Sequence, residues 1–79
     1  MEIVINWSHK RAKHATERMK SRGISRNEII MALGRGEKKK QFRSGLWEVF
    51  FADYSLVFDE YINEKDTIRK VYPVKLKRW

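Results

Sequence analysis

The residues best suited to chemistry lie in the segment between His14 and Arg22. On a helix with about 100° per residue, His14, Arg18 and Arg22 share one sector with Arg11, because successive members lie three or four residues apart. A histidine titrates near neutral pH and can accept or donate a proton. Each guanidinium can hold a phosphate through two hydrogen bonds. The sector is therefore suited to phosphodiester chemistry, but a basic helix can present the same pattern as a plain solvated face.

This basic sector borders an apolar one. Ala12, Ala15, Thr16 and Met19 fall side by side on the wheel and are expected to contact the rest of the fold. Charged groups at such a border are partly desolvated, so their interactions are stronger than on the open surface. His9 lies about 140° away from His14 on the wheel, and we assign it no role.

Two helices are expected to position the sector. Ser8 can cap a first helix that begins at His9, runs to about Arg22 and ends at Gly23. The segment Ser25-Arg26-Asn27-Glu28 matches a capping box before a second helix, which ends in Gly34-Arg35-Gly36. Both helices are short, so they need packing for stability.

Strands occupy the rest of the chain. Ile3-Val4-Ile5 predicts a short N-terminal strand, and apolar runs predict further strands at Leu46–Ala52, Ser55–Ile62 and Thr67–Leu76. Pro73 indicates an edge or an exit. We predict one α+β domain over residues 1–79, with two helices on one face of a three- to four-stranded antiparallel sheet. The other face is expected to be partly apolar and exposed, as a binding surface would be.

Composition narrows the function classes. The 79 residues include 18 Lys and Arg against 10 Asp and Glu, giving a net charge of +8. Such an excess favours a polyanionic partner, either nucleic acid or an acidic protein. The chain has no cysteine and only two histidines, so we expect no disulfide, metal or cofactor. The apolar runs are too short for a membrane span or a signal peptide, so we expect a cytoplasmic protein.

Phosphodiester cleavage by acid–base catalysis also needs a second proton carrier, which must come from the strands. Glu48 and Tyr72 are the candidates, although a salt bridge to a helix arginine is the expected structural role of Glu48, and Tyr72 is expected in the core or an interface. Aromatic side chains can stack on unpaired bases or simply fill the core. We expect core packing for Phe50 and Phe51 and leave both roles open for Trp47, Tyr54 and Trp79. Contacts to a nucleic-acid backbone are expected from Arg11, Lys38, Lys39, Lys40 and Lys70.

The helical half of the chain resembles a known signature. The pattern is Lys13-His14-Ala15-x-x-Arg18-Met19-x-x-Arg22-Gly23-Ile24-Ser25, followed by Glu28-Ile29 and a glycine after the second helix. It resembles domain-of-unknown-function family 4258, which is similar to the small RNA-cleaving toxins with the barnase–EndoU–colicin–RelE type of fold. The resemblance implies a RelE-like sheet and a metal-independent ribonuclease in which His14, Arg18 and Arg22 act together. In relatives a Ser or Thr often precedes the Val-Tyr of the last strand, whereas this chain has Lys70.

These observations lead to one main hypothesis and two alternatives. The main hypothesis is an endoribonuclease toxin of a toxin–antitoxin pair, which cleaves free or ribosome-bound mRNA and is inhibited by an acidic antitoxin. The first alternative is a catalytically inactive module of the same fold that binds nucleic acid. The second is a protein-interaction module whose basic face matches an acidic partner.

Overall fold

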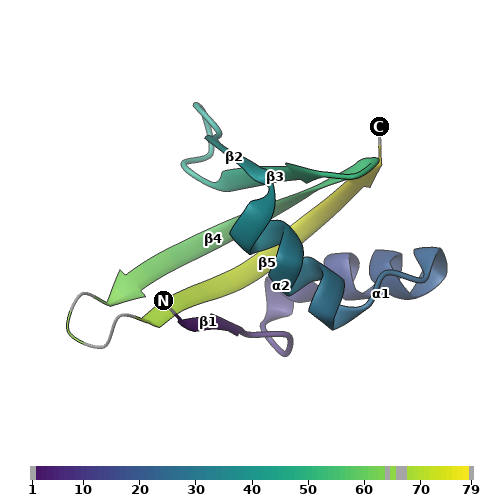
Figure 1. The fold of residues 1–79 in the computed structure, drawn as a ribbon, viewed down its shortest axis with the longest axis horizontal. Helices are drawn as coiled ribbons and strands as arrows, with labels where there is room; N and C mark the ends of the chain where they lie inside the picture. Colours follow the sequence, from purple (N-terminus) through teal and green to yellow (C-terminus); the bar gives the residue numbers. More distant parts are fainter. Residues whose placement is uncertain (1, 64, 66–67, 79) are drawn as a thin grey trace.

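The structure is a computed structural model of the chain, and it describes residues 2–63, 65 and 68–78. Thr67 and Trp79 lie outside these residues. The elements are β1 (Glu2–Ile5), the 3-10 turn η1 (Lys10–Ala12), α1 (Lys13–Arg22), α2 (Arg26–Arg35), β2 (Glu37–Lys40), β3 (Trp47–Phe51), β4 (Tyr54–Asn63) and β5 (Ile68–Arg78). Figure 1 shows that the long β4–β5 hairpin runs through the molecule and that the other elements lie beside it.

The predicted α+β class is confirmed, and the sheet gains a parallel strand. It has five strands in the order β1-β5-β4-β3-β2. The four strands β2 to β5 are antiparallel, as predicted, whereas β1 pairs in parallel with the first part of β5. Because β1 reaches only to Val71 in this pairing, Pro73 lies where β5 has no strand neighbour on that side. The edge position predicted from Pro73 is therefore confirmed.

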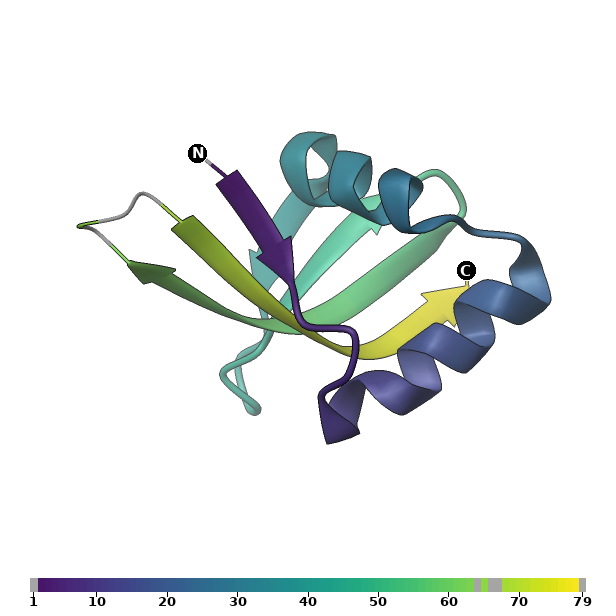
Figure 2. The ribbon, with the colours of Figure 1, turned by 90° about the horizontal axis from the view of Figure 1, so that it is seen from below.

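Side-chain alternation gives the sheet two different faces. The core side chains Val49, Leu56, Phe58 and Val71 point to the face that α2 covers, where they meet Ile29 and Leu33. The alternate residues of β4 and β5 point to the opposite side, which we call the open face. Figure 2 shows both helices on the covered side of the sheet or beside it, and η1 extending past the edge of β5 towards the open face.

A close contact fixes α2 on the sheet. A Cβ atom at Gly36 would lie 2.6 Å from the Ala32 carbonyl oxygen and 2.6 Å from Cγ2 of Val49. Only glycine therefore lets the chain leave α2 and enter β2 this close to β3. The C-terminal end of α2 is thus held close against β3.

The start of the first helix differs from the prediction. Ser8 bonds to the Asn6 side chain instead of capping a helix. The chain enters a 3-10 turn at Lys10, and Nδ1 of His9 accepts the backbone N–H of Arg11 at 3.2 Å. The other predicted caps are confirmed: Gly23 ends α1 in the left-handed region, and Oγ of Ser25 accepts the N–H of Glu28 at 3.1 Å.

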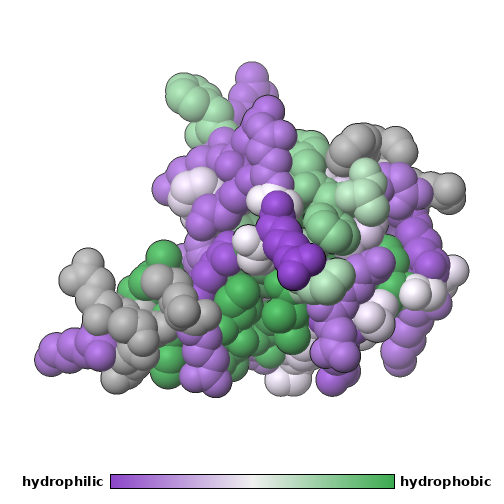
Figure 3. Space-filling view, in the orientation of Figure 1, coloured by the Kyte–Doolittle hydropathy of each residue, from purple (hydrophilic) through white to green (hydrophobic). Residues whose placement is uncertain are grey.

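The surface is mostly hydrophilic on the side that carries the helices, with hydrophobic atoms gathered beside β1 (Figure 3). The large apolar side chains exposed to solvent are spread over several elements: Val4, Ile30, Met31, Phe42, Tyr61 and Ile62. The open face is partly apolar, as expected: Tyr61 is exposed there, Phe50 and Tyr72 are half-buried, and polar side chains lie between them. Within the described ranges, no helix is long and apolar enough to cross a membrane.

Candidate functional site

Two neighbouring hollows lie along the seam where η1 and α1 meet β5. The His14 hollow measures about 430 Å³ and is lined by His14, Arg18, Val74, Lys75 and Leu76. The ring hollow measures about 620 Å³ and is lined by His9, Arg11, Asp59, Tyr61, Lys70 and Tyr72. Arg11 and His14 lie three residues apart, and so do Tyr72 and Lys75, so the two hollows follow one another along the seam.

The His14 hollow combines an imidazole with two cations. His14 and Arg18 are one helical turn apart on α1, so they project from the same side of the helix. Both are exposed, while Leu76, only 1% exposed, forms part of an apolar wall. Lys75 adds an ammonium group from β5. An exposed imidazole beside a guanidinium and an ammonium can bind a phosphate and exchange a proton with it.

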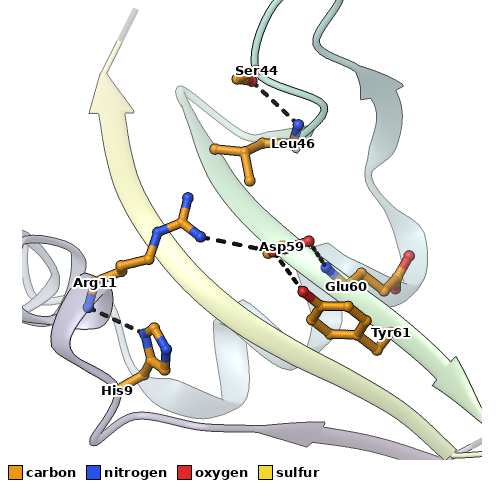
Figure 4. Close-up of polar contacts among 7 residues, drawn as sticks. All are labelled: His9, Arg11, Ser44, Leu46, Asp59, Glu60 and Tyr61. Carbon is orange, nitrogen blue, oxygen red and sulfur yellow. Dashed lines mark hydrogen bonds and ion pairs between the residues drawn. The ribbon is translucent and has the colours of Figure 1, made fainter.

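The ring hollow is held together by its own side chains (Figure 4). Arg11 reaches across β5 to Asp59 on β4, with Nη1 3.7 Å from Oδ2. The hydroxyl of Tyr61 donates to the same oxygen at 3.2 Å. Asp59 raises the pKa of Tyr61 through its negative charge and this hydrogen bond, so the phenol stays protonated well above neutral pH.

Three rings form the wall of this hollow. The rings of His9 and Tyr72 lie 5.3 Å apart at 67°, and those of Tyr61 and Tyr72 lie 5.5 Å apart at 80°. Such edge-to-face geometry is favourable for aromatic pairs. Because Nδ1 of His9 accepts the Arg11 N–H, the neutral imidazole carries its proton on Nε2. His9 is therefore a hydrogen-bond donor towards a ligand.

Arg22 does not join the other members of the basic sector. It lines a separate hollow of about 250 Å³ together with Ser21, Ile24, Asp53 and Tyr54. Tyr54 is only 3% exposed, and burial together with the nearby Glu28 raises its pKa to about 12. Tyr54 is thus a core residue, which rules out base stacking for it. The four residues of the predicted basic sector therefore line three different hollows: Arg11 the ring hollow, His14 and Arg18 the His14 hollow, and Arg22 the hollow beside Tyr54.

Glu48 does not form the predicted salt bridge to a helix arginine. Its carboxylate accepts hydrogen bonds from Oγ of Ser55 at 2.5 Å and from Nε2 of Gln41 at 3.2 Å. Burial alone would raise the pKa of Glu48, but these two bonds and the Lys77 ammonium outweigh burial and lower the pKa. Glu48 is consequently ionised at neutral pH and cannot supply a proton. It anchors the β2–β3 loop, where Ser44 binds both Gln41 and the N–H of Leu46.

The lysine run divides between the two faces. Nζ of Lys38 lies 2.7 Å from Glu60 on the covered side, and burial together with the charge of Arg69 lowers its pKa. Lys38 and Lys40 also lie over the ring of Trp47, at 4.3 and 5.3 Å from its centre. Of the three lysines predicted to contact RNA in this run, only Lys39 points to the open face, whereas Lys38 and Lys40 point to the covered face.

The strand aromatics differ in their surroundings. Trp47 and Phe51 are partly buried and pack against the core, as one of the predicted roles required. Phe50 is half-buried on the open face, with Nζ of Lys39 5.8 Å from the centre of its ring. The core position expected for Phe51 is therefore confirmed, whereas the one expected for Phe50 is wrong, because strand alternation turns Phe50 to the open face.

Glu60 and Arg69 form a second polar cluster, on the covered face. Their side chains are 3% and 12% exposed and form an ion pair. Nη1 of Arg69 also donates to the Leu33 carbonyl at 2.8 Å. This cluster joins the end of α2 to β4 and β5, so it serves the fold. Within the described part of the chain, no group of three or more carboxylates and histidines is placed to hold a metal ion.

Sequence reasoning missed four residues of the seam: His9, Asp59, Tyr61 and Lys75. Alternation along β4 and β5 would place Asp59 and Tyr61 on the same face as Lys70 and Tyr72, once the register of the two strands is known. Comparison of the chain with protein-family models, curated proteins and solved structures finds no match. The function is therefore inferred from the arrangement of these side chains.

Proposed function

We propose that this protein is a metal-independent endoribonuclease whose chemistry takes place in the His14 hollow. The observation that carries this proposal is the grouping of an exposed imidazole, a guanidinium and an ammonium group against an apolar wall. The net charge of +8 supports a polyanionic substrate. Lys70, Lys75 and Lys77 are exposed along the last strand, where they can follow an RNA backbone.

In this proposal His14 carries the proton in both transfers, in place of the two carriers expected from the sequence. His14 accepts the proton of the 2′-hydroxyl, and the 2′-oxygen attacks phosphorus. The bond from phosphorus to the 5′-oxygen breaks, and His14 returns the proton to this leaving oxygen. Arg18 and Lys75 stabilise the additional negative charge on the phosphoryl oxygens. The products are a 2′,3′-cyclic phosphate and a 5′-hydroxyl end.

Tyr72 and Arg22 have smaller parts in this proposal than in the sequence-based hypothesis. Tyr72 lines the neighbouring ring hollow, and Arg22 lines the hollow near the β3–β4 turn. Glu48 is excluded as an acid because it is ionised and doubly hydrogen-bonded. Neither Glu48 nor Tyr72 lines the His14 hollow, so both proton transfers are assigned to His14.

The resemblance to domain-of-unknown-function family 4258 extends the proposal to a biological role. A toxin that cleaves mRNA acts in the cytoplasm and needs an inhibitor, and the basic surface suits an acidic antitoxin. Expression of the wild-type protein is expected to stop growth, and His14→Ala is expected to relieve this. Co-expression of an acidic protein encoded beside the gene is expected to restore growth as well.

The direct test is incubation of total RNA with the purified protein in EDTA, followed by mapping of the new ends. We expect cleavage products that carry 2′,3′-cyclic phosphates. Arg18→Ala should slow the reaction strongly. Lys20→Ala removes the same charge from α1 outside the hollow and should have little effect. RNA that stays intact in both EDTA and magnesium would refute the ribonuclease.

One observation favours a second candidate, a nucleic-acid-binding module without catalysis. Among the described residues, no hydrogen bond or ion pair orients the imidazole of His14, whereas catalytic histidines usually have an orienting partner. Such a module would bind RNA with strong salt dependence and leave it uncut. The same incubation, combined with a binding measurement, separates the two functions.

A further inference from the structure

We propose that the ring hollow is a subsite for an unpaired nucleobase, so that the substrate is single-stranded RNA; the identity of the polymer rests on the proposed function. The three rings of His9, Tyr61 and Tyr72 meet only edge to face, at 67° and 80°. None of them is stacked flat on another. Tyr61 is 59% exposed, so its ring is open to a flat ligand. A hollow of about 620 Å³ lies in the range of small-molecule sites.

The rings are already fixed before a ligand binds. One carboxylate oxygen of Asp59 accepts the hydrogen bond of the Tyr61 hydroxyl and forms the ion pair with the Arg11 guanidinium. The backbone of Arg11 in turn holds the imidazole of His9. A ligand therefore loses little affinity to the ordering of these side chains.

Two cations and one carboxylate, Asp59, line the ring hollow, so its net positive charge favours an anionic aromatic ligand. Lys70 lies opposite Tyr61 in the strand register and is exposed, and Arg11 borders the same space. Rings that can stack on a base, beside cations that can bind its phosphate, are the combination found in sites for single-stranded nucleic acid. A base inside a duplex is stacked on its neighbours and cannot enter such a hollow.

The subsite also has a defined place relative to the chemistry. The seam continues from Tyr72 to Lys75 along β5 and from Arg11 to His14 along the helical segment. A base held in the ring hollow therefore directs the adjoining backbone towards the His14 hollow. The ring hollow positions the strand, and the His14 hollow cleaves it.

The test uses a short 2′-O-methyl RNA oligonucleotide, which lacks the 2′-hydroxyl and cannot be cleaved. Its affinity is measured by fluorescence anisotropy as a single strand, as a duplex, and as a single strand with abasic sites. We expect the single strand to bind roughly tenfold or more tightly than the abasic strand. Tyr61→Leu should remove this advantage, whereas Tyr61→Phe, which keeps the ring, should preserve it. Duplex binding should be equal in all variants.

Ile62→Ala is the matched control. Ile62 is 51% exposed and is the next residue on β4, but it points to the covered face. Equal binding by Tyr61→Leu and Tyr61→Phe, with both folded as judged by thermal melting, would overturn the subsite. Equal binding of the intact and abasic strands would overturn it too. If free nucleoside monophosphates compete as well as the strand does, the site is for small nucleotides and the RNA subsite is wrong.

The experiments distinguish a failure of the proposed nucleobase subsite from a failure of the proposed ribonuclease activity. Base-dependent binding through Tyr61 without any cleavage of natural RNA would support the subsite and refute the ribonuclease. Normal cleavage by Tyr61→Leu with unchanged affinity would refute the subsite and leave the ribonuclease standing.

Discussion

The two hollows of the seam differ in how their imidazoles are held. In the ring hollow, His9 already accepts a hydrogen bond at Nδ1 and meets the ring of Tyr72. In the His14 hollow, His14 has no such contact with any described residue. An imidazole that uses its lone pair to cap a turn is a poor proton acceptor, whereas a free one can accept a proton. This difference fits the two proposed roles, recognition in the ring hollow and proton transfer in the His14 hollow.

The same contrast holds for charge. The ring hollow contains a carboxylate, Asp59, which partly balances Arg11. The His14 hollow is lined by Arg18 and Lys75, and the Glu17 carboxylate borders His14 and Arg18 in a separate shallow hollow. A phosphate dianion or a pentavalent phosphorane is thus better accommodated in the His14 hollow. A bound phosphate would also provide the partner that His14 lacks.

After the loss of His14 itself, the largest expected effect concerns charge in the His14 hollow. Arg18→Ala is expected to reduce cleavage of a single-stranded RNA by about 100-fold, because one donor aimed at the transition state is lost. Lys20→Ala should change the rate by no more than about twofold, since an exposed distant charge is screened by salt. Initial rates in EDTA provide the measurement. An equal loss in the two variants would mean that α1 acts only through its overall charge.

A smaller effect concerns stability and tests whether His9 and His14 differ as claimed. His9→Ala removes the cap of η1 and should lower the free energy of unfolding by about 1 kcal/mol. His9→Asn keeps a capping acceptor and should restore most of this loss. His14→Ala should leave stability unchanged or raise it by a few tenths of a kcal/mol, because Ala favours a helix. Urea unfolding at neutral pH measures all three, and a similar loss in both Ala variants would contradict the contrast.

The smallest effect concerns the phenol of the ring hollow. The negative charge of Asp59 and its hydrogen bond raise the pKa of Tyr61 in the folded protein. Because the pKa of Tyr61 is higher in the folded protein, the interaction stabilises the fold fully at pH values below the ordinary tyrosine pKa of about 10. This stabilisation is lost as the pH rises through the pKa of Tyr61 in the folded protein. Asp59→Asn should therefore lower the pKa of Tyr61, as followed by NMR titration of labelled tyrosine. An unchanged titration would show that the carboxylate does not hold the ring.

Local signals in the sequence were sufficient for most of the fold. Gly23 and Ser25 mark a helix end and a helix start, and the apolar runs mark β3, β4 and β5. The partner of β1 could not be predicted, because a run of three apolar residues carries no information on which strand it joins. The parallel pairing depends instead on where the chain returns after the β4–β5 hairpin.

The site was only partly predictable for a geometric reason. The basic sector assumed α-helical geometry from His9 onwards, but residues 10–12 form a 3-10 turn. Such a turn advances about 120° per residue instead of about 100°, so Arg11 points to a different hollow from His14. The ring hollow also needs Asp59 beside Tyr72 and Tyr61 beside Lys70 across two strands. That register becomes known only when the hairpin is folded.

The most direct measurement is single-turnover cleavage of one labelled single-stranded RNA in EDTA by the wild-type protein, His14→Ala and His9→Asn. We predict that His14→Ala reduces the rate by about 100-fold or more, the usual contribution of a general base or acid. His9→Asn should retain cleavage. His14→Ala that cleaves at the wild-type rate would contradict the assignment of the chemistry to the His14 hollow.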